Sequence, residues 1–294
     1  MSSGVLCTLP GGWLDRRGGC QREVVLRPLR GGDEEWLYSL PPQTSQVSVL
    51  TMLLARCVKR IGPYRASRAM IRTLSMGDCD FLVLRLHGLT FGERVERVLV
   101  CPDAACGAKM DLDFELGQVP VEERPRRPRY TLRLEGSPAR EVGFRLPGLG
   151  DVEAASRAED PERALLARCV LDLDGKATPG GDAVDALPDA AREALDAAME
   201  QASPRVEDTL EARCPECGRE FPTTFDATAS FLASLYSQRH EFDRAVHLLS
   251  FHYHWPLGEI LGLTRERRRH YVRLLRDALD VGSGLSARER AEAS

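Results

Sequence analysis

The sequence predicts a mixed α+β protein that contains a tandem-duplicated unit and ends in a helical segment. The hexapeptide LLARCV occurs twice, at residues 53–58 and at 165–170. A Cys-Pro dipeptide opens one cysteine pair at Cys101 and a second at Cys214. Beyond Asp226 the apolar residues recur at helical spacing alone. These observations predict two related units of short strands and helices, followed by a C-terminal helical segment.

Composition and charge narrow the classes of protein that the chain can represent. Its 294 residues are 43% apolar and 29% charged, which is typical of globular proteins. With 40 basic and 44 acidic residues the formal net charge is −4, so no overall positive field attracts nucleic acid or anionic lipid.

The N-terminus and the cysteine count favour a reducing compartment. Residues 1–20 have neither a basic region nor an apolar run typical of a secretory signal. The nearly apolar stretch at 47–58 is shorter than the roughly 20 residues that cross a bilayer. Nine cysteines, an odd number, favour reduced thiols and metal binding over a disulfide framework. We therefore expect a cytoplasmic protein without a membrane span.

The duplication extends beyond the LLARCV motif. The segment that begins at Arg22, REVVLRPLRGGDEEW, is followed 118 residues later by REVGFRLPGLGDVEA, which begins at Arg140. We expect a flexible N-terminal segment, a first repeat, a Pro- and Arg-rich linker, a second repeat, a helical segment and a flexible tail. Their bounds are 1–20, 21–118, 119–130, 131–226, 227–280 and 281–294.

Each repeat is expected to follow the same order of elements. An alternating segment, at 23–29 and again at 141–146, predicts a strand. A helix over LLARCV follows, and then a second helix at 78–89 or 191–202. Short strands lead into and out of each cysteine pair. Residues 172–188 are expected to form a loop within the second repeat.

The C-terminal segment carries the signals of three further helical stretches. Apolar residues from Phe231 to Tyr253 form an approximate helical stripe. Pro256 and Gly262 bracket a short helix, and Thr264 can cap a last helix that begins after it.

The cysteine pairs carry the strongest chemical signal. Cys214 and Cys217 lie in CPECG, a knuckle that can supply two corners of a zinc tetrahedron, and Cys101 and Cys106 lie in CPDAACG. Both pairs lie between expected strands, so we predict one split zinc ribbon with structural Zn²⁺. Two alternatives are that only the second pair holds metal and that the second pair is a redox motif, although a redox Cys-x-x-Cys motif opens a helix.

The remaining candidates favour structural roles. Cys57 and Cys169 occupy equivalent places in the two LLARCV helices and fit core positions, as Cys79 also does, while Cys7 and Cys20 have no assigned role. His240, His247, His252 and His254 lack the spacing of a zinc-protease motif and fit helix edges. No motif assembles a catalytic nucleophile and base, so we expect no enzyme activity. The basic run at 124–129 has the proline content of a solvated linker, and the C-terminal part that contains the run at 265–270 has too little net positive charge for a nucleic-acid surface.

Several longer motifs occur in order between residues 22 and 280: RPLRGGDEEWL, LLARCVKRIGP, LTFGERVERVLVCPDAACGAKMDLDF, CPECGREFPTTFD and YHWPLGEILGLTRERRRHYVRLL. This series resembles the baseplate hub assembly chaperone family of T-even-like phages, which has homologues in bacterial contractile injection systems. The resemblance implies a non-enzymatic role in baseplate or hub assembly, with the four knuckle cysteines as metal ligands. The sequence departs from the family at the first knuckle, where two extra residues separate Cys101 from Cys106.

The implied partners are baseplate or hub proteins of a contractile tail-like particle, and the protein either leaves after assembly or stays in the particle. Apolar residues of the C-terminal helices are candidates for the partner surface: Trp255, Leu257, Ile260, Leu261 and Tyr271. Ordinary helix packing is the competing explanation for these five residues. The alternative function is a zinc-ribbon adaptor that binds nucleic acid or regulates other proteins.

Overall fold

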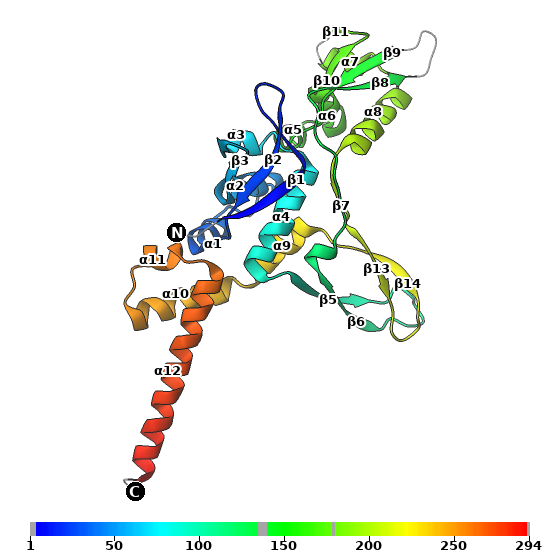
Figure 1. Cartoon of the computed structure of the whole chain (residues 1–294). Helices are drawn as coiled ribbons and strands as arrows, with labels where there is room; N and C mark the ends of the chain where they lie inside the picture. Colours follow the sequence, from blue (N-terminus) through cyan, green and yellow to red (C-terminus); the bar gives the residue numbers. More distant parts are fainter. Residues whose placement is uncertain (1–3, 135–139, 178–179, 293–294) are drawn as a thin grey trace. The chain divides into compact units, whose positions relative to one another are not determined.

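The computed structural model describes residues 4–134, 140–177 and 180–292 (Figure 1). The chain divides into two compact units. The large unit comprises Met1–Arg27 and Gln43–Thr228, and the helical unit comprises Pro28–Pro42 and Ala229–Ser294. Both helices and strands are well represented, which confirms the mixed α+β class.

The first sheet of the large unit has the order β1-β2-β3-β4. Its strands are antiparallel. They span Val5–Leu14, Cys20–Leu26, Val58–Ile61 and Tyr64–Arg65. Inward-facing Leu9, Val24 and Ile61 are fully buried. The associated helices are α2 (Gln46–Cys57), α3 (Arg68–Ile71) and α4 (Met76–Phe91), each preceded by a serine whose side chain accepts a backbone N–H of the first turn.

The second sheet has the order β11-β10-β9-β8, so in both sheets the strands are ordered as they follow along the chain. Its strands span Tyr130–Leu134, Arg140–Phe144, Val170–Leu173 and Lys176–Ala177. Its helices are α5 (Leu149–Ala155), α6 (Pro161–Cys169), α7 (Gly180–Asp185) and α8 (Asp189–Ala202). Val142, Phe144, Leu166 and Leu195 are central to its hydrophobic core.

Two hairpins project from the large unit next to one another (Figure 1). One pairs β5 (Arg94–Val100) with β6 (Lys109–Glu115), and the other pairs β13 (Thr209–Arg213) with β14 (Glu220–Thr224). Near their base, β7 (Val121–Glu122), which follows the short 3₁₀ helix η1 (Leu116–Gln118), pairs with β12 (Arg205–Val206). The strands predicted on either side of each cysteine pair are confirmed.

The helical unit is formed by α1 (Gly31–Tyr38), most of α9 (Ala227–Ser237), α10 (Arg239–Tyr253), α11 (Leu257–Gly262) and α12 (Arg265–Glu292). Glu34 of α1 is fully buried between two buried arginines of α12, Arg265 and Arg268. The Arg265 Nη1 atom lies 3.0 Å from the Glu34 carboxylate. The predicted cap of the last helix is confirmed, because Thr264 Oγ1 accepts the Arg267 N–H at 3.4 Å.

The prediction of a flexible segment over residues 1–20 is wrong, because residues 5–14 form strand β1. The Pro10-Gly11-Gly12 sequence suggests a turn, yet it forms an irregularity within the β1–β2 pair. Both glycine amides donate to buried Asp78 in α4, at 2.7 Å and 3.1 Å. A carboxylate 66 residues away in the chain therefore satisfies the backbone where the strand pairing is interrupted.

Three other predicted irregular segments also contain regular structure. Residues 172–188, expected to be a loop, contain part of β10, the strand β11 and the helix α7. The turn at Asp174-Gly175 has positive φ at both residues, the conformation that an Asp-Gly hairpin turn adopts. The expected linker at 119–130 contains β7 and the largely buried side chain of Arg126. The expected flexible tail begins inside α12, which continues to Glu292.

Candidate metal centre

The tips of the two hairpins bring the four predicted cysteines together. Cys101 and Cys106 come from the β5–β6 hairpin, and Cys214 and Cys217 come from the β13–β14 hairpin. Their four Sγ atoms all lie within 4.8 Å of one another. Cys101 and Cys214 are buried, Cys106 is half-buried and Cys217 is exposed. The site therefore lies at the surface with two of its thiols facing inward.

The sulfur spacing fits a tetrahedral ion. A metal–sulfur bond of about 2.3 Å gives a tetrahedral S···S edge of about 3.8 Å. The Cys101–Cys217 and Cys106–Cys214 pairs, which cross between the hairpins, have Sγ···Sγ distances of 3.7 Å and 3.8 Å. Both distances far exceed the roughly 2.05 Å of a disulfide bond. The four cysteines could therefore hold one metal ion with a ligand at each corner.

Each cysteine pair lies on a tight turn stabilised by backbone hydrogen bonds. The Cys214 N–H donates to the Arg219 carbonyl at 2.8 Å, and the Gly218 N–H donates to the Cys214 carbonyl at 2.9 Å. Gly218 has a φ of 75°, a left-handed conformation that favours glycine over other residues. This turn is the local reason that the CPECG sequence places its two thiols side by side.

The wider first knuckle keeps a comparable turn. The N–H groups of Cys106 and Gly107 both donate to the Asp103 carbonyl at 2.9 Å, and Gly107 has a φ of 55°. The Asp103 carboxylate also accepts the Ala105 N–H at 2.9 Å. The two extra residues of CPDAACG are thus taken up in a turn around Asp103, and Cys106 remains within reach of the other knuckle.

Backbone amides and neighbouring thiols shift the pKa values of these cysteines in opposite directions. The backbone N–H of Cys217, together with that of Glu216, lowers the pKa of Cys214 to about 7. The Asp103 amide lowers the pKa of Cys101, but desolvation and the thiols of Cys217 and Cys214 outweigh it and raise that pKa to about 12. One thiolate therefore forms readily, whereas four require a cation among them.

Contacts between the hairpins stabilise the arrangement of the sulfurs. Arg219 lies 3.4 Å from the Asp103 carboxylate of the opposite knuckle. Further down, Arg97 of β5 donates to the Thr224 carbonyl of β14 at 3.2 Å. The rings of Phe114 and Phe225 meet edge to face at 5.0 Å between centroids. These contacts join the two hairpins through residues other than the four cysteines.

None of the other cysteines that the structure describes belongs to this cluster. Cys57, Cys79 and Cys169 are buried, and burial raises the pKa of Cys169 to about 11. Across the three described ranges, the cysteine tetrad is the one group of at least three His, Cys, Asp or Glu side chains placed to hold a metal ion. The four C-terminal histidines are exposed at separate positions along α10 and just after it.

The five candidate partner-binding residues lie together in the helical unit but differ in exposure. The Trp255 ring packs edge to face against Tyr271, with 4.9 Å between ring centroids, and stacks on Tyr253, with 5.2 Å between centroids. Leu257 is 49% exposed, and Leu261 is half-buried. Ile260 is fully buried in a core with Leu249 and Val272, so its assignment to an exposed surface is wrong. Helical spacing alone does not separate the buried side of a six-residue helix from the exposed side.

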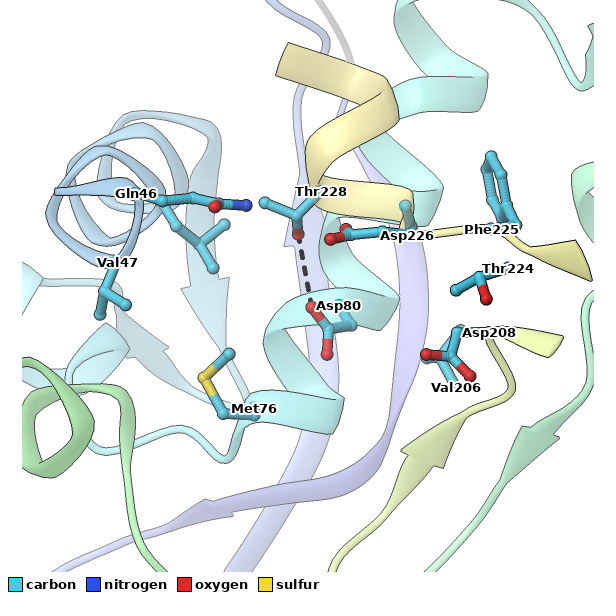
Figure 2. A pocket seen from close by; sticks show the side chains of 12 residues that line it. Gln46, Val47, Met76, Asp80, Val206, Asp208, Thr224, Phe225, Asp226 and Thr228 are labelled. Atoms are coloured by element: carbon cyan, nitrogen blue, oxygen red, sulfur yellow. Dashed lines mark hydrogen bonds between the residues drawn. The ribbon is translucent and has the colours of Figure 1, made fainter. Parts of the chain in front are cut away.

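Sequence reasoning missed a cavity of about 410 Å³ in the large unit (Figure 2). Asp80 of α4 lies in it and accepts a hydrogen bond from Thr228 Oγ1 at 3.3 Å. Burial raises the pKa of Asp80 to about 6, and the carboxylates of Asp226 and Asp208 add to the rise. The sequence DCD at 78–80 shows the acidic group, but Asp208, Asp226 and Thr228, which act on its carboxylate, all lie more than 120 positions further along the chain.

The fold and the cysteine site define a mixed α+β protein in which two hairpins form one four-thiol cluster suited to a metal ion. The chain belongs to the family described as T4 bacteriophage base plate protein, whose model matches residues 14–233. No curated protein and no solved structure matches the chain. In the part of the chain that the structure describes, no helix combines the length and apolar character needed to cross a membrane.

Proposed function

We propose that this protein takes part in the assembly or structure of the baseplate or hub of a contractile phage tail, or of a phage-tail-like injection system. The match of the base plate family model over residues 14–233 is the observation that carries the proposal. The protein acts through protein–protein contacts and catalyses no reaction. Its partners are other baseplate or hub proteins.

The four-thiol cluster binds one structural Zn²⁺ in this proposal. Four cysteine ligands are typical of structural zinc, and they leave no open coordination position for a substrate. The crossed distances of 3.7 Å and 3.8 Å support a single ion shared by both hairpins. Because Cys101 and Cys217 are 116 residues apart in the chain, such an ion stabilises a long-range contact within the large unit.

The proposal includes an internal duplication with a split zinc ribbon. Along the chain, two strands, two helices, two strands and two helices occur first from β1 to α4 and again from β8 to α8. A cysteine-bearing hairpin follows each series, after the short strand β12 in the second case. The two LLARCV sequences end α2 and α6, and both helices lead directly into the third strand of their sheet. These correspondences support descent of the two halves from one unit.

An aromatic patch in the helical unit is the proposed partner surface. We define the patch as Tyr253, Trp255, Leu257 and Tyr271. Tyr253 is 36% exposed and Leu257 49% exposed, while the three rings contact one another. Large aromatic side chains with accessible faces are common anchors of protein interfaces. Ile260 lies in the buried cluster against which Trp255 and Tyr271 pack, and it makes no partner contact.

The experiment that tests the function is mass spectrometry of sedimented particles from cells that express the protein with its genomic neighbours. A fixed ratio to sheath and baseplate subunits supports a permanent particle component. Absence from finished particles, together with loss of particles when the gene is deleted, supports an assembly chaperone. Absence together with normal particle formation in the deletion strain contradicts the proposal and favours a nucleic-acid or regulatory adaptor.

A further inference from the structure

The large unit contains a second cavity, of about 480 Å³, whose walls carry four arginines. We call it the arginine pocket and define it by Arg72, Arg126, Arg145 and Arg168, with Asp151 as the carboxylate among them. Its volume lies within the range of roughly 300–1,000 Å³ that is usual for small-ligand sites. It is separate from the four-thiol cluster and shares no residue with it.

The guanidinium groups are fixed by the surrounding backbone and by Asp151. Arg126 is only 8% exposed and donates to the carbonyls of Thr73 and, at 2.6 Å, Leu146. Arg145 donates two hydrogen bonds to the Asp151 carboxylate, of 2.7 Å and 3.0 Å. Arg168 donates to the same carboxylate through Nε at 3.0 Å. One carboxylate thus serves two arginines.

Positive charge remains in excess when the adjoining groups are included. Glu153 lies next to the pocket and pairs with both Arg72 and Arg157. Buried Asp78 is the remaining carboxylate that acts on Arg126 from outside the pocket. The pocket and the groups next to it therefore contain five guanidinium groups and three carboxylates. The cations are Arg72, Arg126, Arg145, Arg157 and Arg168, and the anions are Asp78, Asp151 and Glu153. Burial lowers the pKa of Arg126, which reflects the cost of holding this cation away from water.

Unused donors show where an anion would bind. A guanidinium carries five N–H donors. Within the described residues, Arg168 donates a hydrogen bond through Nε and Arg72 donates one through Nη1. Other N–H groups of both side chains therefore remain for a ligand. Paired N–H groups of arginine match the oxygens of carboxylate and phosphate, and such charge-assisted hydrogen bonds are stronger than neutral ones.

We propose that the arginine pocket binds an oxyanion, a phosphate or carboxylate group. The excess of two positive charges and the buried Arg126 carry this inference. The cavity exceeds the size of one such group, so it accommodates the group together with part of the molecule that bears it. The oxyanion belongs either to a free small molecule or to an acidic segment of a partner protein. The inference is independent of the proposed baseplate role.

Calorimetric titration of the full-length protein tests this inference with three probes: inorganic phosphate, citrate and a hexaglutamate peptide. Chloride replaces each probe in matched blanks, so that ionic strength stays constant. The double variant Arg72→Gln/Arg168→Gln removes the available donors and should weaken binding about tenfold or more. The control variant Arg163→Gln, on the same helix α6, loses only an exposed pair with Asp185 and should bind as the native protein does.

The three probes distinguish the sources of the anion. Saturable binding of phosphate or citrate that the double variant loses assigns the pocket to a free small molecule. Binding of the peptide alone, with the same loss, assigns it to an acidic segment of a partner. If the native protein binds none of the probes up to about 10 mM, or the double variant binds equally well, the inference is wrong. Thermal melts of all variants show whether a loss of binding reflects unfolding. If the double variant is unfolded, Arg168→Lys, which keeps the charge, replaces it. This variant should bind the probes more weakly than the native protein does.

Discussion

Replacement of Asp80 by asparagine should stabilise the protein at neutral pH. Burial beside Thr228 raises the pKa of this carboxyl from 3.8 to about 6. The folded state therefore holds the Asp80 proton more tightly than the unfolded state does. The contribution of Asp80 to the free energy of unfolding therefore falls as pH rises from about 4 to about 6. Above that range the ionised carboxylate destabilises the folded state by the full amount. Asparagine carries no charge, and its amide oxygen can still accept the Thr228 hydrogen bond.

The magnitude follows from the size of the shift. A difference of about two pH units corresponds to about 3 kcal/mol, because each unit is worth about 1.4 kcal/mol. We expect Asp80→Asn to raise the free energy of unfolding by up to about 3 kcal/mol at pH 7.5 and to have little effect near pH 4. Urea denaturation of the native protein and the variant, compared at each pH, measures this difference directly.

A matched control separates the effect of Asp80 from general loss of negative charge. Asp196 is exposed on α8, so Asp196→Asn should change the free energy of unfolding by less than about 0.5 kcal/mol at every pH. If Asp80→Asn proves destabilising at pH 7.5, or if its effect does not vary between pH 4 and pH 7.5, the reasoning about the buried carboxylate is refuted.

Three further outcomes are expected. Cys214→Ser should lower the melting temperature and abolish its response to a strong chelator, whereas Cys20→Ser should keep a response like that of the native protein. Glu34→Gln should destabilise the helical unit by about 3–5 kcal/mol because two buried guanidinium groups lose their carboxylate, while exposed Glu35→Gln should be near neutral in the same denaturation experiment. Leu257→Asp should remove the protein from sedimented particles, or stop particle formation, without a change in melting temperature; retention in normal particles would exclude the aromatic patch as the partner surface.

The elements that the sequence predicted well carry their signal locally. The LLARCV segments have apolar residues at helical spacing, and both end helices of 12 and 9 residues. The cysteine knuckles combine ligand spacing with a following glycine, and both form turns with that glycine in the left-handed region. The grouping of the four cysteines could be predicted because the two Cys-Pro pairs, like the two LLARCV motifs, recur at nearly the same spacing along the chain.

The elements that were missed depend on distant residues or on short sequences. Strand β1 contains Pro10-Gly11-Gly12, and the carboxylate that compensates its broken pairing belongs to Asp78. Glu34 and Arg265 are 231 residues apart, so no local pattern indicates that they are buried together. Helix α1 begins with Gly-Gly-Asp-Glu-Glu and lacks an apolar stripe, so periodicity could not reveal it.

The proposed zinc site shared by the two hairpins is best tested by metal analysis combined with X-ray absorption spectroscopy of the purified full-length protein. We expect one zinc ion per chain, surrounded by four sulfur atoms at about 2.3 Å. We also expect Cys106→Ser, in the wider knuckle, to replace one of the four sulfurs or to abolish metal binding. Metal-free protein with four reduced thiols, or an ion held by the sulfurs of Cys214 and Cys217 alone, would contradict the proposed shared zinc site.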